Sequence, residues 1–202
     1  MPKRTDIRKM VLGAVIALIA VPALAETPKL DIRTKNRLPI EERRKEQMVR
    51  LANQYDLKKY TITREILIDR GAMNHSHPVL TLNPRFLDDD DLALSAYVHE
   101  QGHWVLTERT RNENPLLFED LQQAFPHLAV RPPQGDGELR SSYFHIAVCM
   151  LEWQALEELI GPQRAHRVIE WKQQDHYKAI YSILLHQREQ VESVLSRHGV
   201  HW

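Results

Sequence analysis

The sequence predicts an α+β, mainly helical domain in which a small antiparallel sheet packs on two of the helices. Two short strand patterns occur in the first half of the chain, at residues 61–69 and 79–83. Apolar residues with helical spacing dominate the rest, at 92–106, 143–160 and 163–197. Because the strands are few and no internal repeat occurs, we expect one domain rather than several.

Residues 1–25 have the pattern of a secretory signal peptide. Four basic residues precede an apolar run at 11–21 that is too short to span a bilayer comfortably. Ala23 and Ala25 form a small-residue cleavage pattern. We therefore expect a periplasmic or secreted domain over 26–202, without stable membrane insertion after cleavage. The alternative is an uncleaved membrane anchor.

The composition of the predicted mature chain limits its partners. It carries 23 Lys and Arg against 26 Asp and Glu, a slightly acidic balance that does not suggest a nucleic acid partner. Cys149 is the only cysteine, so no internal disulfide can form. We expect this thiol to be a small buried apolar group, and the fold to depend on its core rather than on cross-links.

The chain before residue 92 is expected to supply the sheet and one helix. Residues 26–39 are predicted to be an extended arm, followed by an amphipathic helix at 40–60. The strand patterns at 61–69 and 79–83 are separated by a stretch with turn character at 70–78.

The second half is expected to be helical around one long loop. Residues 107–142 are rich in Pro and Gly and predict a loop with a short helix at 116–125, which is either a lid or a solvated connector. The helix at 143–160 is closed by Gly161, and Pro162 opens the next one. The C-terminal helical segment, 163–202, is one helix or two and either covers the core or forms a dimer surface.

The most informative motif is at residues 99–103, which read His-Glu-Gln-Gly-His. Acidic residues at 88–91 predict the start of a helix, because aspartate caps helix N-termini and suits their dipole. On that helix His99 and His103 share one face and can bind one metal ion. Glu100 can reach a water on that ion as general base. This pattern is typical of zinc metalloproteases and predicts one Zn²⁺ per chain.

A third protein ligand must come from elsewhere, because a catalytic zinc site has three protein ligands and a water. Glu152 on the 143–160 helix has apolar neighbours at spacings of three, four and seven. A carboxylate buried there needs a counter-charge, which zinc would supply. Glu157, in a mixed setting, is the reserve ligand. The structural alternative is a Glu152 that is paired with an arginine or hydrogen-bonded in the core.

These residues resemble the gluzincin metallopeptidases, and most closely the minimal versions of that family. The resemblance covers roughly residues 40–162 and depends on the strand at 79–83, the 99–103 motif and the Glu-Trp-Gln-Ala sequence at 152–155. It implies a zincin-like core in which a strand, an HExxH helix and a Glu-bearing helix pack together. Ala155 would then let the two helices approach each other.

The resemblance also implies the roles of the site residues. His99, His103 and Glu152 would bind zinc, and Glu100 would be the general base. Many gluzincins have an acid four residues after the glutamate ligand, where it orients a zinc-bound histidine, but this chain has Leu156 there. The partner of that histidine is therefore expected elsewhere, from Glu157 or a backbone carbonyl.

The expected function is zinc-dependent hydrolysis of peptide bonds in a peptide or protein substrate. Gluzincins use a tyrosine or histidine to stabilise the oxyanion, and the candidates here are Tyr143, His145, His176 and Tyr177. The strand at 79–83 could pair with an extended peptide as an edge strand. Two alternatives are a non-catalytic zinc-stabilised binding protein of the cell envelope and a zinc amidase acting on a cell-wall fragment. His75 and His77 form a separate His-x-His that is expected to be exposed in a turn, with weak metal binding as the alternative.

Overall fold

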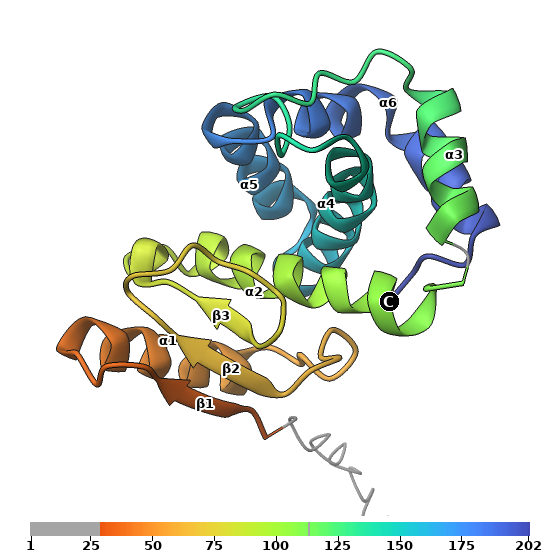
Figure 1. Cartoon of the computed structure of the whole chain (residues 1–202). Helices are drawn as coiled ribbons and strands as arrows, with labels where there is room; N and C mark the ends of the chain where they lie inside the picture. Colours follow the sequence, from red (N-terminus) through yellow and green to blue (C-terminus); the bar gives the residue numbers. More distant parts are fainter. Residues whose placement is uncertain (1–28, 113) are drawn as a thin grey trace, which may run out of the picture.

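The computed structural model describes residues 29–112 and 114–202, so the predicted signal peptide lies outside the described residues. Within them, helices predominate over one three-stranded sheet, which confirms the mainly helical α+β class. In Figure 1 the sheet and α1 lie on one side of α2, and α3 to α6 lie on the other. The elements are β1 (Asp31–Thr34), α1 (Pro39–Gln54), β2 (Glu65–Ile68), β3 (Leu80–Leu82), α2 (Asp90–Trp104), a π-helix (Val105–Arg109), α3 (Asn114–Ala124), α4 (Leu139–Ile160), α5 (Pro162–Asp175) and α6 (Lys178–Arg197).

The sheet is parallel, and the predicted antiparallel arrangement is wrong. Its order is β1-β2-β3, with Ile32 opposite Ile66 and Ile66 opposite Leu80. The segment predicted to be an extended arm contributes β1. Because α1 connects β1 to β2, the chain returns to the same end of the sheet before the second strand begins, which produces parallel pairing.

The connection between β2 and β3 explains the rest of this error. Its turn residues suggested a hairpin, but the loop crosses back and only His75 pairs in the antiparallel sense, with Thr81. The backbone N–H of Thr81 donates to the His75 carbonyl at 2.7 Å, and the side chain of Asn74 accepts from the N–H of Asn83. The outer edge of β3 is therefore already occupied by the chain itself.

The helix boundaries follow local signals. Asp89 accepts a hydrogen bond from the N–H of Leu92 and caps α2, whose first turn carries two further aspartates, as predicted. Gly161, with a φ of 84°, ends α4, and Pro162 starts α5. The C-terminal segment forms two helices, α5 and α6. The predicted loop region after α2 contains a π-helix and α3, and π-helices often occur at functional sites.

Helix α2 is buried on nearly all sides, from Leu92 to Gly102. Gln101, on the side opposite the histidines, accepts from the N–H groups of Ile62 and Thr63 and donates to the Thr63 carbonyl. These three hydrogen bonds fasten α2 to the segment leading into β2. The motif that supplies the two histidines therefore also holds α2 to the chain that leads into the sheet.

Gly102 lies where α2 packs directly against α4. A Cβ added there would lie 3.4 Å from Val148 Cγ1 and 3.7 Å from Leu151 Cβ. We expect Gly102→Ala to fold, because these are ordinary contacts and alanine favours helix. Gly102→Leu should lose ~1–3 kcal/mol of the free energy of unfolding through overpacking. Urea unfolding of the two variants measures this, and a Gly102→Leu protein as stable as wild type would contradict it.

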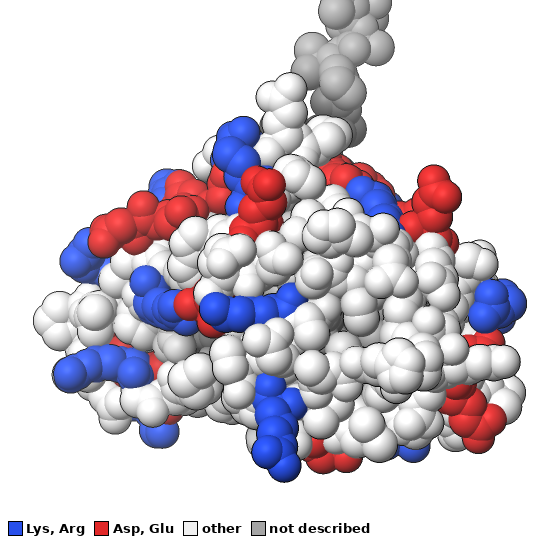
Figure 2. Space-filling model, turned by 90° about the horizontal axis from the view of Figure 1, so that it is seen from above, with Lys and Arg blue, Asp and Glu red and all other residues white. Residues whose placement is uncertain are grey.

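The surface seen in Figure 2 carries scattered acidic and basic side chains between larger uncharged areas. Among the described helices, none is long and apolar enough to cross a membrane.

Candidate metal centre

Three histidines meet between α2 and α4. His99 and His103 come from α2, as predicted, and His145 comes from the first half of α4. One nitrogen from each ring can be chosen so that all three lie within 4.8 Å of one another. Nitrogens bound to tetrahedral zinc at 2.0–2.1 Å are about 3.3 Å apart. Small ring movements would therefore suffice for the cluster to hold one ion.

The two helices run in opposite senses along their contact. Ser95 and His99 of α2 bond to Glu152, Gly102 faces Val148, and the ring of His103 lies 4.9 Å from that of His145. The later turns of α2 therefore meet the earlier turns of α4. This register brings His145 to the histidine pair and places Glu152, about two turns further along α4, beside His99 and Ser95.

Each of two histidines has one nitrogen fixed by a hydrogen bond. His99 Nδ1 donates to Glu152 Oε2 at 2.9 Å, and His145 Nδ1 donates to the Ser141 carbonyl at 2.9 Å. The remaining nitrogen of each ring, Nε2, then carries the lone pair that can bind a metal. Partners of this kind fix the tautomer and the ring orientation of metal-binding histidines.

Glu152 is fully buried and fully bonded. Ser95 Oγ donates to its Oε1, while His99 Nδ1 and the Tyr181 hydroxyl donate to its Oε2, the latter at 2.9 Å. Lys172 Nζ lies 3.7 Å from Oε1. Among the described residues, Glu152 groups with His99 and Cys149 but not with His103. The carboxylate expected to complete the triad is therefore a neighbour of His99.

Burial controls the protonation of this cluster. It lowers the pKa of His99 to about 4, although the hydrogen bond from His99 to Glu152 acts in the opposite direction. Burial also lowers the pKa of His103 and of His145 below the ordinary histidine value. Neutral imidazole is the form that binds a metal ion. The three rings therefore present the donor set that a metal requires.

Two buried carboxyl groups beside the cluster differ in charge. Burial raises the pKa of Glu100 to about 8, against the opposing effect of the Lys172 charge. Burial acts in the same direction on Glu152, but the Lys172 charge and the His99 hydrogen bond outweigh it and lower its pKa. A cation held by the histidines would favour the ionised form of Glu100, the form that a general base needs.

A cleft of about 450 Å³ opens onto His99 and Glu100. Its walls come from the loop before β3, the loop before α4 and the junction of α5 with α6. The lining residues that carry polar or charged groups are Asn74, Asn83, Arg85, Asp136, Lys172, Asp175, His176 and Tyr177. A second hollow, of about 330 Å³, reaches His103 and His145 and includes His77, Thr107 and Phe144. The cluster is thus accessible from two directions.

The four candidate oxyanion donors have different positions. Tyr143 donates its hydroxyl to the Phe125 carbonyl, and Tyr177 donates to Asp136 at 3.0 Å, so both are engaged. His145 belongs to the cluster itself. His176 lines the cleft, and its Nδ1 lies 2.7 Å from Asp175 Oδ2. Of the four, only His176 combines a place in the cleft with a ring nitrogen, Nε2, that no described residue engages.

The predictions for Cys149 and Glu157 have different outcomes. Cys149 is fully buried, as predicted. The carboxylate of Glu157 lies outside the cluster, where Arg188 binds it in a bidentate fashion at 2.6 and 2.8 Å. The partners of the histidines are instead Glu152 and the Ser141 carbonyl.

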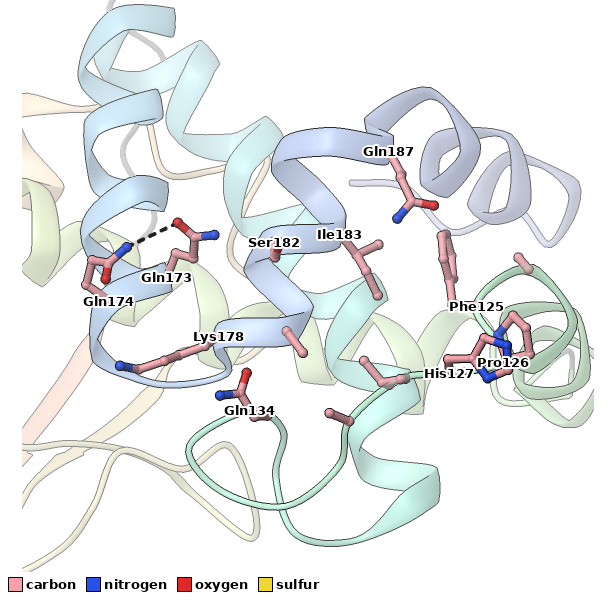
Figure 3. A pocket seen from close by; sticks show the side chains of 14 residues that line it. Phe125, Pro126, His127, Gln134, Gln173, Gln174, Lys178, Ser182, Ile183 and Gln187 are labelled. Carbon is pink, nitrogen blue, oxygen red and sulfur yellow. Dashed lines mark hydrogen bonds between the residues drawn. The ribbon is translucent and has the colours of Figure 1, made fainter.

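A larger cavity, of about 680 Å³, lies away from the metal centre between the loop after α3 and the start of α6 (Figure 3). Four glutamine side chains border it, together with Phe125, Ile183 and Lys178. None of its lining residues belongs to the histidine cluster.

No family model, no curated protein and no solved structure matches the chain. The function of the protein is therefore inferred from the site.

Proposed function

We propose that this protein is an exported zinc-dependent metallopeptidase. The observation that carries the proposal is the convergence of three imidazoles, two of them buried and that of His103 partly exposed, next to Glu100. His99 and Glu100 of this group line a cleft. Three nitrogen ligands and one open position describe a catalytic zinc site. Imidazole donors suit zinc, although they also suit other transition metals.

We propose His99, His103 and His145 as the ligands, with Glu152 as a positioning residue for His99. In this assignment His145 replaces Glu152, which the resemblance to gluzincins made a ligand. Support comes from the hydrogen bonds: Glu152 binds the Nδ1 of His99, so the ring can offer only Nε2 to the metal. Residues of this kind raise the basicity of a ligating histidine and hold its ring.

A zinc ion in this position would polarise a bound water and the carbonyl of the substrate. With zinc held there, Glu100 would accept a proton from the water as its oxygen attacks the substrate carbonyl, and would return that proton to the leaving amine. Its burial beside His99 suits this role, because water exclusion strengthens charge interactions in a site. His176 would donate from Nε2 to the developing oxyanion as an imidazolium, the form that the Asp175 carboxylate favours by raising the pKa of His176 against the larger, opposing effect of burial. Asp175 also holds the ring, and Arg85 binds Asp175 at 2.5 and 3.0 Å.

A peptide is the substrate that this arrangement favours. The cleft on the His99 side and the hollow on the His103 side both reach the cluster. An extended chain can therefore lie on both sides of the bond to be cut. Pairing with the outer edge of β3 is disfavoured, since His75 occupies it. The segment carrying His75 and His77 borders the site instead and is held by Trp104, whose Nε1 donates to the Ser76 carbonyl.

The test combines metal analysis with a peptide-library cleavage assay and a chelator control. We expect about one zinc per chain and chelator-sensitive cleavage. A zinc-containing protein that cleaves no peptide but releases fragments from murein would favour the amidase alternative. Zinc without turnover of either substrate would favour the non-catalytic envelope protein.

Glu100→Gln should keep zinc and lose hydrolysis, because the amide cannot accept the proton of the attacking water. We expect kcat to fall by at least ~100-fold, in line with the usual contribution of a general base. Glu108→Gln is the matched control, since Glu108 is exposed just beyond α2. Retained turnover in Glu100→Gln at unchanged zinc content would remove the assigned mechanism.

A further inference from the structure

Lys172 on α5 places a buried ammonium group at the cleft. The residue is only 3% exposed, yet it lines the cleft together with His99 and Glu100. Its sole described carboxylate neighbour within 4.0 Å is Glu152, at 3.7 Å. That distance is too long for a hydrogen bond. An ammonium group has three donors, and burying them without acceptors is costly.

Apart from Glu100, whose pKa the Lys172 charge lowers against the effect of burial, the acidic groups that line the cleft are already engaged. Asp175 is bound by Arg85 and His176, and Asp136 accepts the Tyr177 hydroxyl. Glu152 does not depend on Lys172 for its hydrogen bonds, because three other donors reach its oxygens. Against this background Lys172 is a cation that faces the cleft without a hydrogen-bonding acceptor among the described residues.

The place of Lys172 relative to the cluster sets what it can bind. Glu152, the neighbour of Lys172, accepts a hydrogen bond from Ser95. Ser95 lies one turn before His99 on α2, so these two residues are about 5–6 Å apart along the helix axis. One residue of an extended peptide spans ~3.3–3.6 Å. Because Lys172 lines the same cleft as His99 and Glu100, a peptide bound there with its scissile bond at the cluster would bring a neighbouring residue toward the ammonium.

We propose that Lys172 binds a carboxylate of the substrate, so that the protein prefers peptides with a negative charge close to the bond that is cut. This inference rests on the proposed peptidase function, since it names the substrate class of the same cleft. The carboxylate comes from the peptide C-terminus or from an Asp or Glu side chain. Both sources offer the same pair of oxygens to the ammonium.

The experiment uses matched peptides and the zinc-loaded protein. One arm compares a short peptide with its C-terminal amide, and a second arm compares an internal Glu with Gln in a peptide amidated at its end. Wild type should favour the charged member of at least one pair by about tenfold or more in kcat/KM. The arm that shows this preference identifies the source of the carboxylate.

Two variants decide whether Lys172 is responsible. Lys172→Met keeps the length of the side chain and removes the charge, so the preference should fall to about one. Lys178→Met is the control, because Lys178 borders the separate cavity of Figure 3. A preference that persists in Lys172→Met would place the carboxylate on the metal or elsewhere and overturn the proposal. The absence of any preference in wild type overturns it too, even if Lys172→Met does not fold.

Binding to the Glu100→Gln protein separates this inference from the function. Calorimetric titration with the acid and amide forms of one peptide requires no turnover. If wild type cleaves no peptide but the acid form binds about tenfold more tightly in a Lys172-dependent way, the peptidase proposal fails and the carboxylate site stands. If peptides are cleaved but titration shows equal affinity for both forms, the peptidase stands and the carboxylate site fails.

Discussion

His145→Ala should abolish stable zinc binding while leaving the fold intact. The variant removes one of three proposed ligands. Loss of a residue that only hydrogen-bonds to a ligand lowers metal affinity by up to about 100-fold, so we expect loss of a ligand itself to lower the affinity for zinc by more than that. The fold should survive, because His145 Nδ1 bonds within its own helix to the Ser141 carbonyl and no buried donor on another element is left unpaired. Titration against a competing chelator measures the affinity, and circular dichroism measures the fold.

The matched controls for this variant are other histidines. His166→Ala changes an exposed ring on α5 and should leave zinc affinity unchanged. His176→Ala should keep zinc but lower kcat, because we assign it to the oxyanion and not to the metal. Full zinc affinity in His145→Ala would show that the third ligand is another group, and Glu152 would return as the candidate.

The elements that the sequence predicted well are those with local signals. The aspartates before α2, the four-residue spacing of His99 and His103, and the Gly161–Pro162 boundary each act within one or two helical turns. Such signals need no knowledge of what packs against them. They identified both helices that build the metal centre, and they placed Glu152 correctly in the core.

The sequence did not place His145 in the histidine cluster because its position there depends on how two helices meet. His145 and Glu152 are seven residues apart and share a face of α4, and the sequence expected both near the site. Which of them lies beside His103 depends on the antiparallel register of α4 on α2, set by the contact of Gly102 with Val148. Spacing within one helix contains no information on that register.

The sheet was mispredicted for a similar reason. β1 has only four residues, of which Ile32 alone is buried, so its pattern is too short to be recognised. Its pairing with β2 spans more than thirty positions in the chain. The direction of β3 then depends on the path of the loop before it, where turn-forming residues are equally compatible with a hairpin and with a crossover.

Glu152→Ala should destabilise the metal-free protein. This result distinguishes a Glu152 that is a metal ligand from a Glu152 that positions His99 and is held by hydrogen bonds in the core. If Glu152 were only a ligand, its charge would be uncompensated without zinc, and removing it would leave the stability of the apoprotein unchanged or raise it. In the structure it instead joins Ser95 and His99 of α2, Lys172 of α5 and Tyr181 of α6. Removing one partner of a buried ion pair costs ~3–5 kcal/mol, and three hydrogen-bond donors would also lose their acceptor.

We therefore expect urea unfolding of the apoprotein to show a loss of ~3–5 kcal/mol in Glu152→Ala. Glu152→Gln keeps the shape and one acceptor oxygen, so it should fold more stably than Glu152→Ala and bind zinc ~10–100-fold more weakly than wild type. Glu157→Ala is the matched control on the same helix. It loses only the half-buried pair with Arg188 and should keep wild-type zinc affinity. An apoprotein that gains stability on Glu152→Ala would instead make the carboxylate a metal ligand, because its burial would then depend on the ion alone.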